Sequence, residues 1–344
     1  MEINEIQLFK IDLEEENLTV IDSSTYGSEL SQYLEELFSI VISGSVGQKF
    51  QFNRPTTEVR SQITKINQHS DFAEVSEIIG SRLLNCEFEA QENVAKLGIT
   101  IQKGVLVLAL VSDSGVNKFI ICKADHNEFL DEVTYRRSSG LPVKKKAFKA
   151  FVCNLNDNDS DDEILVYDTN KTDTKYWWSN FLELDKIVRD EDNTERAFKA
   201  IDKKVFDRIR REFPLDYTYL RNSTVRYFRS NDRFEMEEYI GNAIGDYQPY
   251  DSNLNLNVIK NRIRQLPANT RPHFDNQFNI VREKIKARFK STVKLTDQID
   301  LQIKEDFPEN TVLAEIGIDG IKYVKIKSEI GYAYFKNSTN RNNE

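Results

Sequence analysis

The residues with the clearest potential for chemistry are the lysines and arginines that recur between positions 282 and 290. Five cations stand there against one acid, Glu283. Ammonium and guanidinium groups gathered in this way can neutralise successive phosphates of a nucleic acid, and each neutralised phosphate releases close to one counterion. The same side chains can instead cover an apolar helix face with their stems and keep it soluble. The five cations are Arg282, Lys284, Lys286, Arg288 and Lys290.

These cations need an element that holds them on one surface, and the apolar residues among them predict a helix between residues 274 and 289. The spacing of one helical face is shared by Phe278, Val281, Ile285 and Phe289. The cations would then line the two edges of a buried stripe. Apolar and polar residues alternate over 299–303, which indicates a half-buried strand after the helix.

Two further groups of cations lie earlier in the chain. A helix predicted from about Thr194 to Arg211 carries the first group, and a segment that interleaves arginine with tyrosine and phenylalanine carries the second. The first group consists of Arg196, Lys199, Lys203, Lys204, Arg208, Arg210 and Arg211. From the two groups we select six candidate phosphate ligands, Arg208, Arg210, Arg211, Arg221, Arg226 and Arg229.

Both tryptophans of the protein, Trp177 and Trp178, precede these cations. Two large rings in succession usually serve packing, here between one part of the chain and the next. A platform on which bases stack is the alternative.

Composition restricts where such a basic surface can lie. The chain of 344 residues has a net charge of −9, of which residues 1–170 carry −12 and the remainder +3. Any attraction for a polyanion must therefore be local and must come from the second half. Three cysteines without paired spacing indicate reduced core thiols, and the longest apolar run, residues 105–111, is too short to span a membrane. We expect a cytoplasmic protein without a leader.

The order of the predicted elements indicates the α+β class. An N-terminal mixed or antiparallel sheet with helices has a hairpin of residues 99–111 and 116–123 at its centre. A helical middle follows, and a C-terminal helix with a small antiparallel sheet closes the chain. The expected regions are an acidic α+β domain (1–170), a Trp- and Arg-rich connecting region (171–250), a basic α+β region (251–335) and a disordered tail (336–344).

An acidic loop at residues 156–163 is the nearest approach to a metal motif. Asp157, Asp159, Asp161 and Asp168 imitate the spacing of a calcium-binding EF-hand loop. Asp162 occupies the place where that loop needs glycine, so a solvated hairpin loop is the alternative interpretation.

Other catalytic patterns are incomplete. A metal-dependent nuclease of the restriction type needs a second carboxylate two residues before its lysine, and after Asp113 the candidate Lys123 has Ile121 there. No nucleotide-binding or hydrolase signature is present, and we expect no cofactor. The histidines, which have no cysteine or acid partners at ligand spacing, are His69, His126 and His273.

The chain resembles the bacterial nucleoid-associated protein family known as NdpA. The resemblance follows the order NEIQLFKID near the N-terminus, Tyr176-Trp177, FNIVREKIKARFKSTVKLTDQIDLQI and AEIGIDGIKYVKI, and is most specific over residues 274–327. It implies a non-catalytic protein of the cytoplasm and nucleoid that binds double-stranded DNA, with single-stranded DNA possible. No catalytic residues can be transferred from this family.

The acidic first half adds an expectation of self-association or of a protein partner. The main alternative is an interaction subunit of an effector or phage-defence complex, and a nuclease is a third hypothesis. The preferred hypothesis predicts that replacing Lys284, Lys286 and Arg288 by Glu weakens DNA binding without unfolding the protein.

Overall fold

The structure is a computed structural model that describes residues 1–22, 24, 26–43, 46–68, 70–96, 98–143, 148–155, 163–170, 174–286, 291–296, 298–303 and 311–341. The chain divides into two compact units, Met1–Lys286 and Ala287–Glu344. Whether the expected regions divided at residues 170, 250 and 335 fold separately stays a prediction.

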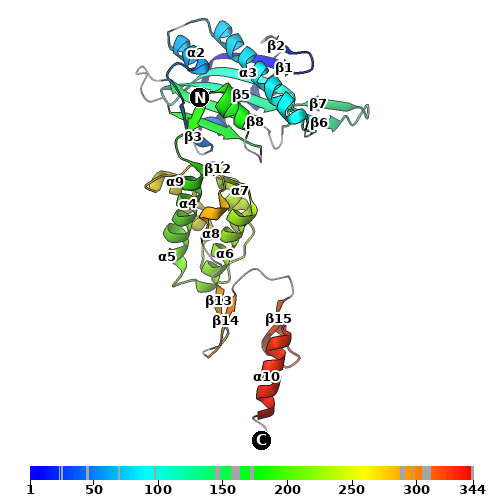
Figure 1. Ribbon diagram of the computed structural model, residues 1–344, viewed down its shortest axis with the longest axis vertical. Coiled ribbons are helices and arrows are strands. Elements are labelled where there is room, and N and C mark those ends of the chain that lie inside the picture. The colour runs from blue at the N-terminus through cyan, green and yellow to red at the C-terminus, as the bar shows by residue number, and fades with distance from the viewer. Residues whose placement is uncertain are drawn as a thin grey trace. The chain divides into compact units, whose positions relative to one another are not determined.

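Within the described residues, the first unit is built on an eight-stranded antiparallel sheet with the strand order β10-β3-β9-β8-β5-β4-β1-β2 (Figure 1). The expected α+β class is confirmed, because the strands return as antiparallel neighbours and the helices occur in separate runs. The strands are β1 (Glu2–Asp12), β2 (Asn17–Ile21), β3 (Gln48–Phe52), β4 (Gly104–Asp113), β5 (Val116–Asp125), β8 (Phe148–Leu155), β9 (Ile164–Asp168) and β10 (Leu184–Lys186).

The predicted hairpin of β4 and β5 lies inside this sheet. The apolar run of β4 faces both ways, since Leu106 and Leu108 join one core and Val107 joins the other. The connecting residues Ser114 and Gly115 have φ values of 52° and 82°. Two consecutive positive φ angles are the geometry of the tight hairpin turn that matches the twist of its strands.

Helices cover both faces of the sheet (Figure 1). The helix at the N-terminal side packs against the core that contains Val107, and two helices with a π-helical turn cover the core that contains Leu106. Asp71 caps the second of these two helices, because its side chain accepts a hydrogen bond from the N–H of Ala73 at 2.9 Å. These elements are α1 (Ser28–Ile42), α2 (Glu58–Asn67), α3 (Phe72–Ala95) and η2 (Tyr176–Phe181).

A helical part, residues 190–285, follows the sheet in the same unit. Its core is aromatic, with Phe234 stacked on Phe278 at a centroid separation of 4.7 Å and on Phe228 at 5.4 Å. Its elements are α4 (Asp190–Ala200), η3 (Ile201–Phe206), α5 (Asp207–Ile209), α6 (Pro214–Ser230), β11 (Arg233–Glu235), α7 (Met236–Tyr239), η4 (Ile240–Ile244), α8 (Leu256–Arg264), α9 (Leu266–Asn269), β12 (Gln277–Asn279) and η5 (Arg282–Lys284).

The prediction of a helix between residues 274 and 289 is wrong for the described residues of this segment, 274–286. Phe278 lies in strand β12 and is the register partner of Phe234 in β11, and residues 282–284 form only a 3-10 turn. Phe278 and Ile280 are both buried. The segment therefore follows the two-residue repeat of a strand and not the helical spacing that its sequence also contains. The contact that decides between the two patterns is made with β11, a strand far away in the sequence.

Hydrogen bonds join the helical part to the sheet. The Gln277 side chain accepts from the N–H of Asp168 at 3.1 Å and donates to its carbonyl at 2.8 Å, as a neighbouring strand would. The Asp275 carboxylate accepts from the N–H of Lys49 at 3.2 Å and from the Asn193 amide at 2.8 Å. Burial raises the pKa of Asp275 to about 6.

The second unit contains hairpins and a helix. Strands β15 and β16 form an antiparallel hairpin around Asp319-Gly320, as the expected small C-terminal sheet requires, and α10 includes residues 336–341 of the expected disordered tail. None of the helices in the described ranges is long and apolar enough to cross a membrane. The elements are β13 (Ser291–Lys294), β14 (Asp300–Ile303), β15 (Val312–Ile316), β16 (Lys322–Ile326) and α10 (Glu329–Arg341).

Candidate nucleic-acid interface

A basic groove lies beside the helix formed by α4 and η3. It encloses about 350 Å³ between this helix and the loop that follows α9. Apolar residues such as Ala197, Ile201 and Val205 face the core, so the charged residues between them face outward. The cations of the groove are Arg196, Lys199, Lys203, Lys204 and Arg271, and its acids are Asp192 and Glu195.

Backbone carbonyls fix two of these cations in place. Arg196 Nη1 donates to the carbonyl of His273 at 3.1 Å, and Lys204 Nζ donates to the carbonyl of Asn269 and to Thr270 Oγ1, each at 3.3 Å. Guanidinium has five N–H donors and ammonium three, so both groups keep donors for a ligand. Cations held in this way lose less conformational freedom when they bind an anion.

Lys203 lies at the exposed edge of the groove. Its ammonium is 3.0 Å from the Asp207 carboxylate, and the side chain is 60% exposed. The hydrogen bond to Asp207 raises the pKa of Lys203, so this residue stays fully protonated at neutral pH. An exposed ion pair is weak and can exchange its carboxylate for a phosphate at small cost.

The helix segregates charge along its axis. Asp190, Glu191 and Asp192 occupy its first turn, where the helix dipole favours acids. Four cations of the groove come later on this helix, and Arg271 adds a fifth from the loop after α9. The groove thus has five cations and two acids, in a chain whose net charge is −9. The positive potential is therefore local, as an acidic protein requires if it is to attract a polyanion.

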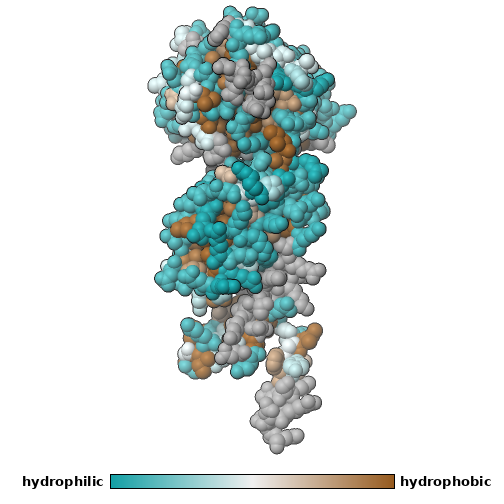
Figure 2. All heavy atoms as spheres, turned by 90° about the vertical axis from the view of Figure 1, so that its left-hand side faces the viewer, coloured by the Kyte–Doolittle hydropathy of each residue, from teal (hydrophilic) through white to brown (hydrophobic). Residues whose placement is uncertain are grey.

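The candidate arginines after the groove are exposed. Arg208 lies four residues after Lys204, on the same side of the helix, and Arg210 and Arg211 follow α5. The Arg210 guanidinium lies 5.6 Å from the ring centre of Tyr217. Figure 2 shows that the face carrying α4, α5 and α9 is mostly hydrophilic. These three arginines can extend the groove.

The selection of Arg221 as a phosphate ligand needs correction. Its side chain is buried, at 7% exposure, and its Nε donates to Asp202 Oδ1 at 2.9 Å. A cation that is buried and paired with a carboxylate belongs to the interior and cannot reach a ligand at the surface. Arg226 and Arg229 lie on the same helix, α6, and are exposed.

The basic stretch from residue 282 is described only in part. Arg282, Lys284 and Lys286 are exposed, and Arg282 forms an ion pair with Asp232 at 2.5 Å. Arg288 and Lys290 lie outside the described residues. Residues 282–284 form only a 3-10 turn, so Arg282, Lys284 and Lys286 do not line the two edges of an α-helix, and contact of this stretch with DNA stays a prediction.

A family model described as nucleoid-associated protein YejK matches residues 10–312. The chain belongs to this family. The match confirms the resemblance to a bacterial nucleoid-associated family, and it spans the sheet, the basic groove and the stretch after it. A comparison with curated proteins finds no match.

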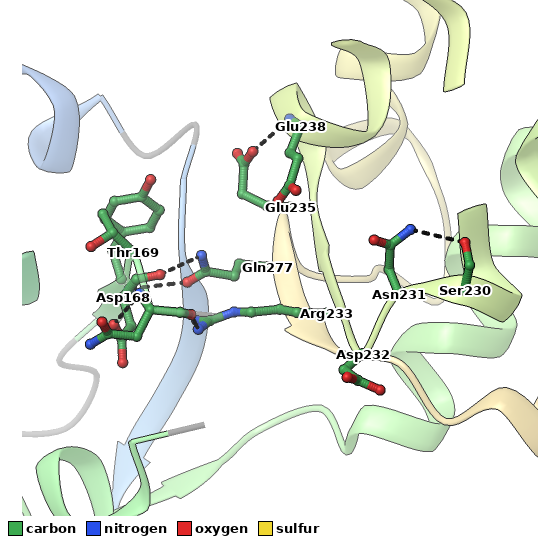
Figure 3. Close-up of a pocket in the computed structure, with 11 residues that line it drawn as sticks. Asp168, Thr169, Ser230, Asn231, Asp232, Arg233, Glu235, Glu238 and Gln277 are labelled. Carbon is green, nitrogen blue, oxygen red and sulfur yellow. Dashed lines mark hydrogen bonds between the residues drawn. The ribbon is translucent and has the colours of Figure 1, made fainter. Parts of the chain in front are cut away.

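A second pocket of this nucleoid-associated family member, of about 260 Å³, has the opposite charge. Figure 3 shows Gln277 and Arg233 directed toward Asp168 from the helical part. Burial raises the pKa of Asp168 and of Glu235. Such a pocket repels phosphate, so it cannot continue the basic groove. Its charged residues are Asp168, Asp232, Arg233, Glu235 and Glu238.

The pattern examined for a nuclease is not assembled. Asp113 is the register partner of Val116, whereas Lys123 is the register partner of Leu106, at the opposite end of the hairpin. Seven residues of strand separate them by roughly 20 Å. Lys123 is fully buried, and its ammonium lies 2.7 Å from the Glu87 carboxylate. The nuclease pattern, incomplete in the sequence because Ile121 replaces the second carboxylate, is thus not brought together by the fold either.

The metal hypotheses also gain no support from the described residues. The acidic loop at 156–162 and His69 lie outside the described ranges. His126 and His273 are described, and burial lowers the pKa of each. Among the described side chains, no group of three or more His, Cys, Asp and Glu residues could hold a metal ion.

The tryptophans serve packing. Trp177 is fully buried in the core under α3, with its ring 5.0 Å from that of Phe181. Trp178 is partly buried and contacts Phe50 at 5.5 Å, with the Lys186 ammonium 5.2 Å from its ring. Trp177 offers no free face on which a base could stack, so the packing interpretation holds for it.

The cations that line the groove from α4 and η3 belong to the first group found in the sequence, but none of them is among the six candidate phosphate ligands. Arg196, Lys199 and Lys203 recur at spacings of three and four, which is a helical-face signal. Arg271 carries no such signal, because it reaches the groove from a loop after α9. Only the tertiary structure places it with the others.

Proposed function

We propose that this protein is a non-catalytic, nucleoid-associated DNA-binding protein that contacts the phosphate backbone of duplex DNA through the basic groove. The observation that carries the proposal is the clustering of five cations against two acids on an otherwise acidic chain. Membership of a nucleoid-associated family supports DNA as the polyanion and the nucleoid as the location. The exposed residues Arg208, Arg210 and Arg211 would extend the contact along the duplex.

The chemistry of the groove favours backbone contacts over base reading. Its donors are lysine and arginine, held by backbone carbonyls at one wall of a shallow helical surface. Contacts of this kind position a protein on DNA without reading its sequence. Affinity should therefore be similar for duplexes of unrelated sequence and should fall steeply as salt is raised.

The test is a titration of labelled duplexes of two unrelated sequences, at several salt concentrations, with the wild-type protein and with a Lys199→Gln/Lys204→Gln variant. We expect equal affinity for both duplexes in the wild type and weaker, less salt-dependent binding in the variant. A wild-type protein that binds neither duplex at low salt refutes the proposal.

A protein-interaction subunit is the second candidate, and exposed apolar residues favour it. The hairpin arm of β6 (Asn127–Leu130) and β7 (Arg137–Gly140) exposes Leu130 by 68% and Val133 by 81%. Exposed apolar clusters of this kind often mark contacts with proteins. Co-purification of a stable partner, combined with no mobility shift of DNA at low salt, would favour this candidate. A role in an effector or phage-defence complex stays a prediction.

A further inference from the structure

Tyrosines gather on the helical part outside the basic groove. The rings of Tyr219 on α6 and Tyr247 after η4 are stacked, with centres 4.1 Å apart and planes 12° from parallel. Tyr219 is 52% exposed, and the neighbouring Tyr250 is 79% exposed. Burial of an aromatic ring is usually favourable. The half-exposed ring of Tyr219 can therefore gain further burial if another flat group stacks on it.

A buried carboxylate fixes the side chain of Tyr247 and the backbone of Tyr250. Asp216 is 1% exposed and accepts hydrogen bonds from the Tyr247 hydroxyl at 2.6 Å and from the N–H of Tyr250 at 2.7 Å. Burial raises the pKa of Tyr247, and its hydrogen bond to Asp216 acts in the same direction, so the phenol stays protonated and donates. Charge-assisted hydrogen bonds are strong and directional, so the Tyr247 ring, on which Tyr219 stacks, is positioned before any ligand arrives.

Cations continue from the tyrosines along the same helix. Arg226 follows Tyr219 by seven residues, which is about two turns, and therefore lies on the same face of α6 about 10 Å further on. Arg229 follows three residues later, and both arginines are exposed. An aromatic surface followed by cations on one face is the combination that proteins use for single-stranded nucleic acids.

We propose that Tyr219, Tyr247 and Tyr250 form a stacking platform for an unpaired base of single-stranded DNA, and that Arg226 and Arg229 bind the phosphates that follow. The proposal rests on the proposed function in taking DNA as the ligand, but it uses a different surface. Bases in a duplex are stacked on one another and cannot reach the platform. The platform therefore accepts single strands, and it accepts any base because every base has a flat face.

The test compares Tyr219→Leu with Tyr219→Trp. Fluorescence anisotropy at low salt measures the affinity of each variant for a labelled thymidine oligonucleotide and for a duplex of mixed sequence. We expect the leucine variant to lose about 5- to 100-fold in affinity for the single strand and to keep its affinity for the duplex. The tryptophan variant should bind the single strand as tightly as wild type. Tyr135→Leu, which removes another tyrosine with 80% exposure, is the matched control.

Unchanged single-strand affinity in the leucine variant overturns the proposal, and so does an equal loss for both forms of DNA. If Tyr219→Leu does not fold, Tyr250→Leu provides the same test at a more exposed position, with a smaller loss expected. A wild-type protein that binds duplex but no single strand refutes the platform and leaves the basic groove. Binding of single strands alone refutes the groove and leaves the platform.

Discussion

Neutralising two lysines of the basic groove should change the salt dependence of DNA binding by a predictable amount. Lys199 and Lys203 are both exposed, and neither is part of the core. Replacing both by glutamine keeps most of their length and removes two positive charges. Since each phosphate contact on duplex DNA contributes about 0.9 to the slope of log affinity against log salt, the slope should fall by about 1.8.

The wild-type slope follows from the lining of the groove. If the five cations of the groove are the phosphate contacts, the slope is about −4.5, and affinity drops about 500-fold between 50 and 200 mM salt; contacts by Arg208, Arg210 and Arg211 would make the slope steeper. With two contacts fewer the slope is about −2.7, and the same change of salt costs about 40-fold. The wild type and the variant should therefore differ most at low salt and converge as salt is raised.

The assay is fluorescence anisotropy of a labelled duplex at four or more salt concentrations. Lys65→Gln, an exposed charge change on α2, is the matched control and should leave the slope unchanged. Thermal unfolding should show nearly unchanged stability in both proteins, because exposed substitutions usually alter stability by less than about 0.5 kcal/mol. A Lys199→Gln/Lys203→Gln protein with the wild-type slope would refute the assignment of the groove.

Three further predictions concern stability and the stretch after the groove. Because burial raises the pKa of Asp275 from 3.8 to about 6, the folded state binds the extra proton between these values, and stability gained at acid pH is lost as pH rises through 6. Asp275→Asn should remove up to about 3 kcal/mol of the pH dependence of the unfolding free energy. Urea unfolding of the wild type and the variant at pH 4.5 and 7.5 measures this difference, and the same pH dependence in both proteins would contradict the prediction. Arg221→Met should cost about 3–5 kcal/mol by leaving Asp202 buried and unpaired, and the double variant with Asp202→Leu should recover part of the loss in thermal unfolding. Lys284→Glu with Lys286→Glu should weaken duplex binding in mobility-shift assays without lowering the melting temperature, and unchanged affinity would confine the contact to the groove.

Local patterns predicted the central hairpin of the sheet because the information lies within a few residues. The apolar run of β4 and the turn Ser114-Gly115 specify a buried hairpin wherever it is placed. Asp319-Gly320 likewise specifies the tight turn between β15 and β16, although the residues of this hairpin are mostly exposed. The prediction for the segment around Phe278 failed because the sequence of this segment fits both a helical and a strand pattern. Its pairing with Phe234 decides between the two.

The sequence by itself determined the α+β class, the strand pairs with short turns, the family likeness and the presence of cations in the second half. Periodicity and turn chemistry are local properties, so they can be read without a structure. Only the tertiary structure decided which cations can meet a ligand. Arg221 and Arg226 look alike in the sequence, yet Arg221 is buried and paired with Asp202, whereas Arg226 is exposed. Arg271 reaches the groove from a distant loop. Burial and proximity arise from contacts between remote segments, and no local pattern records them.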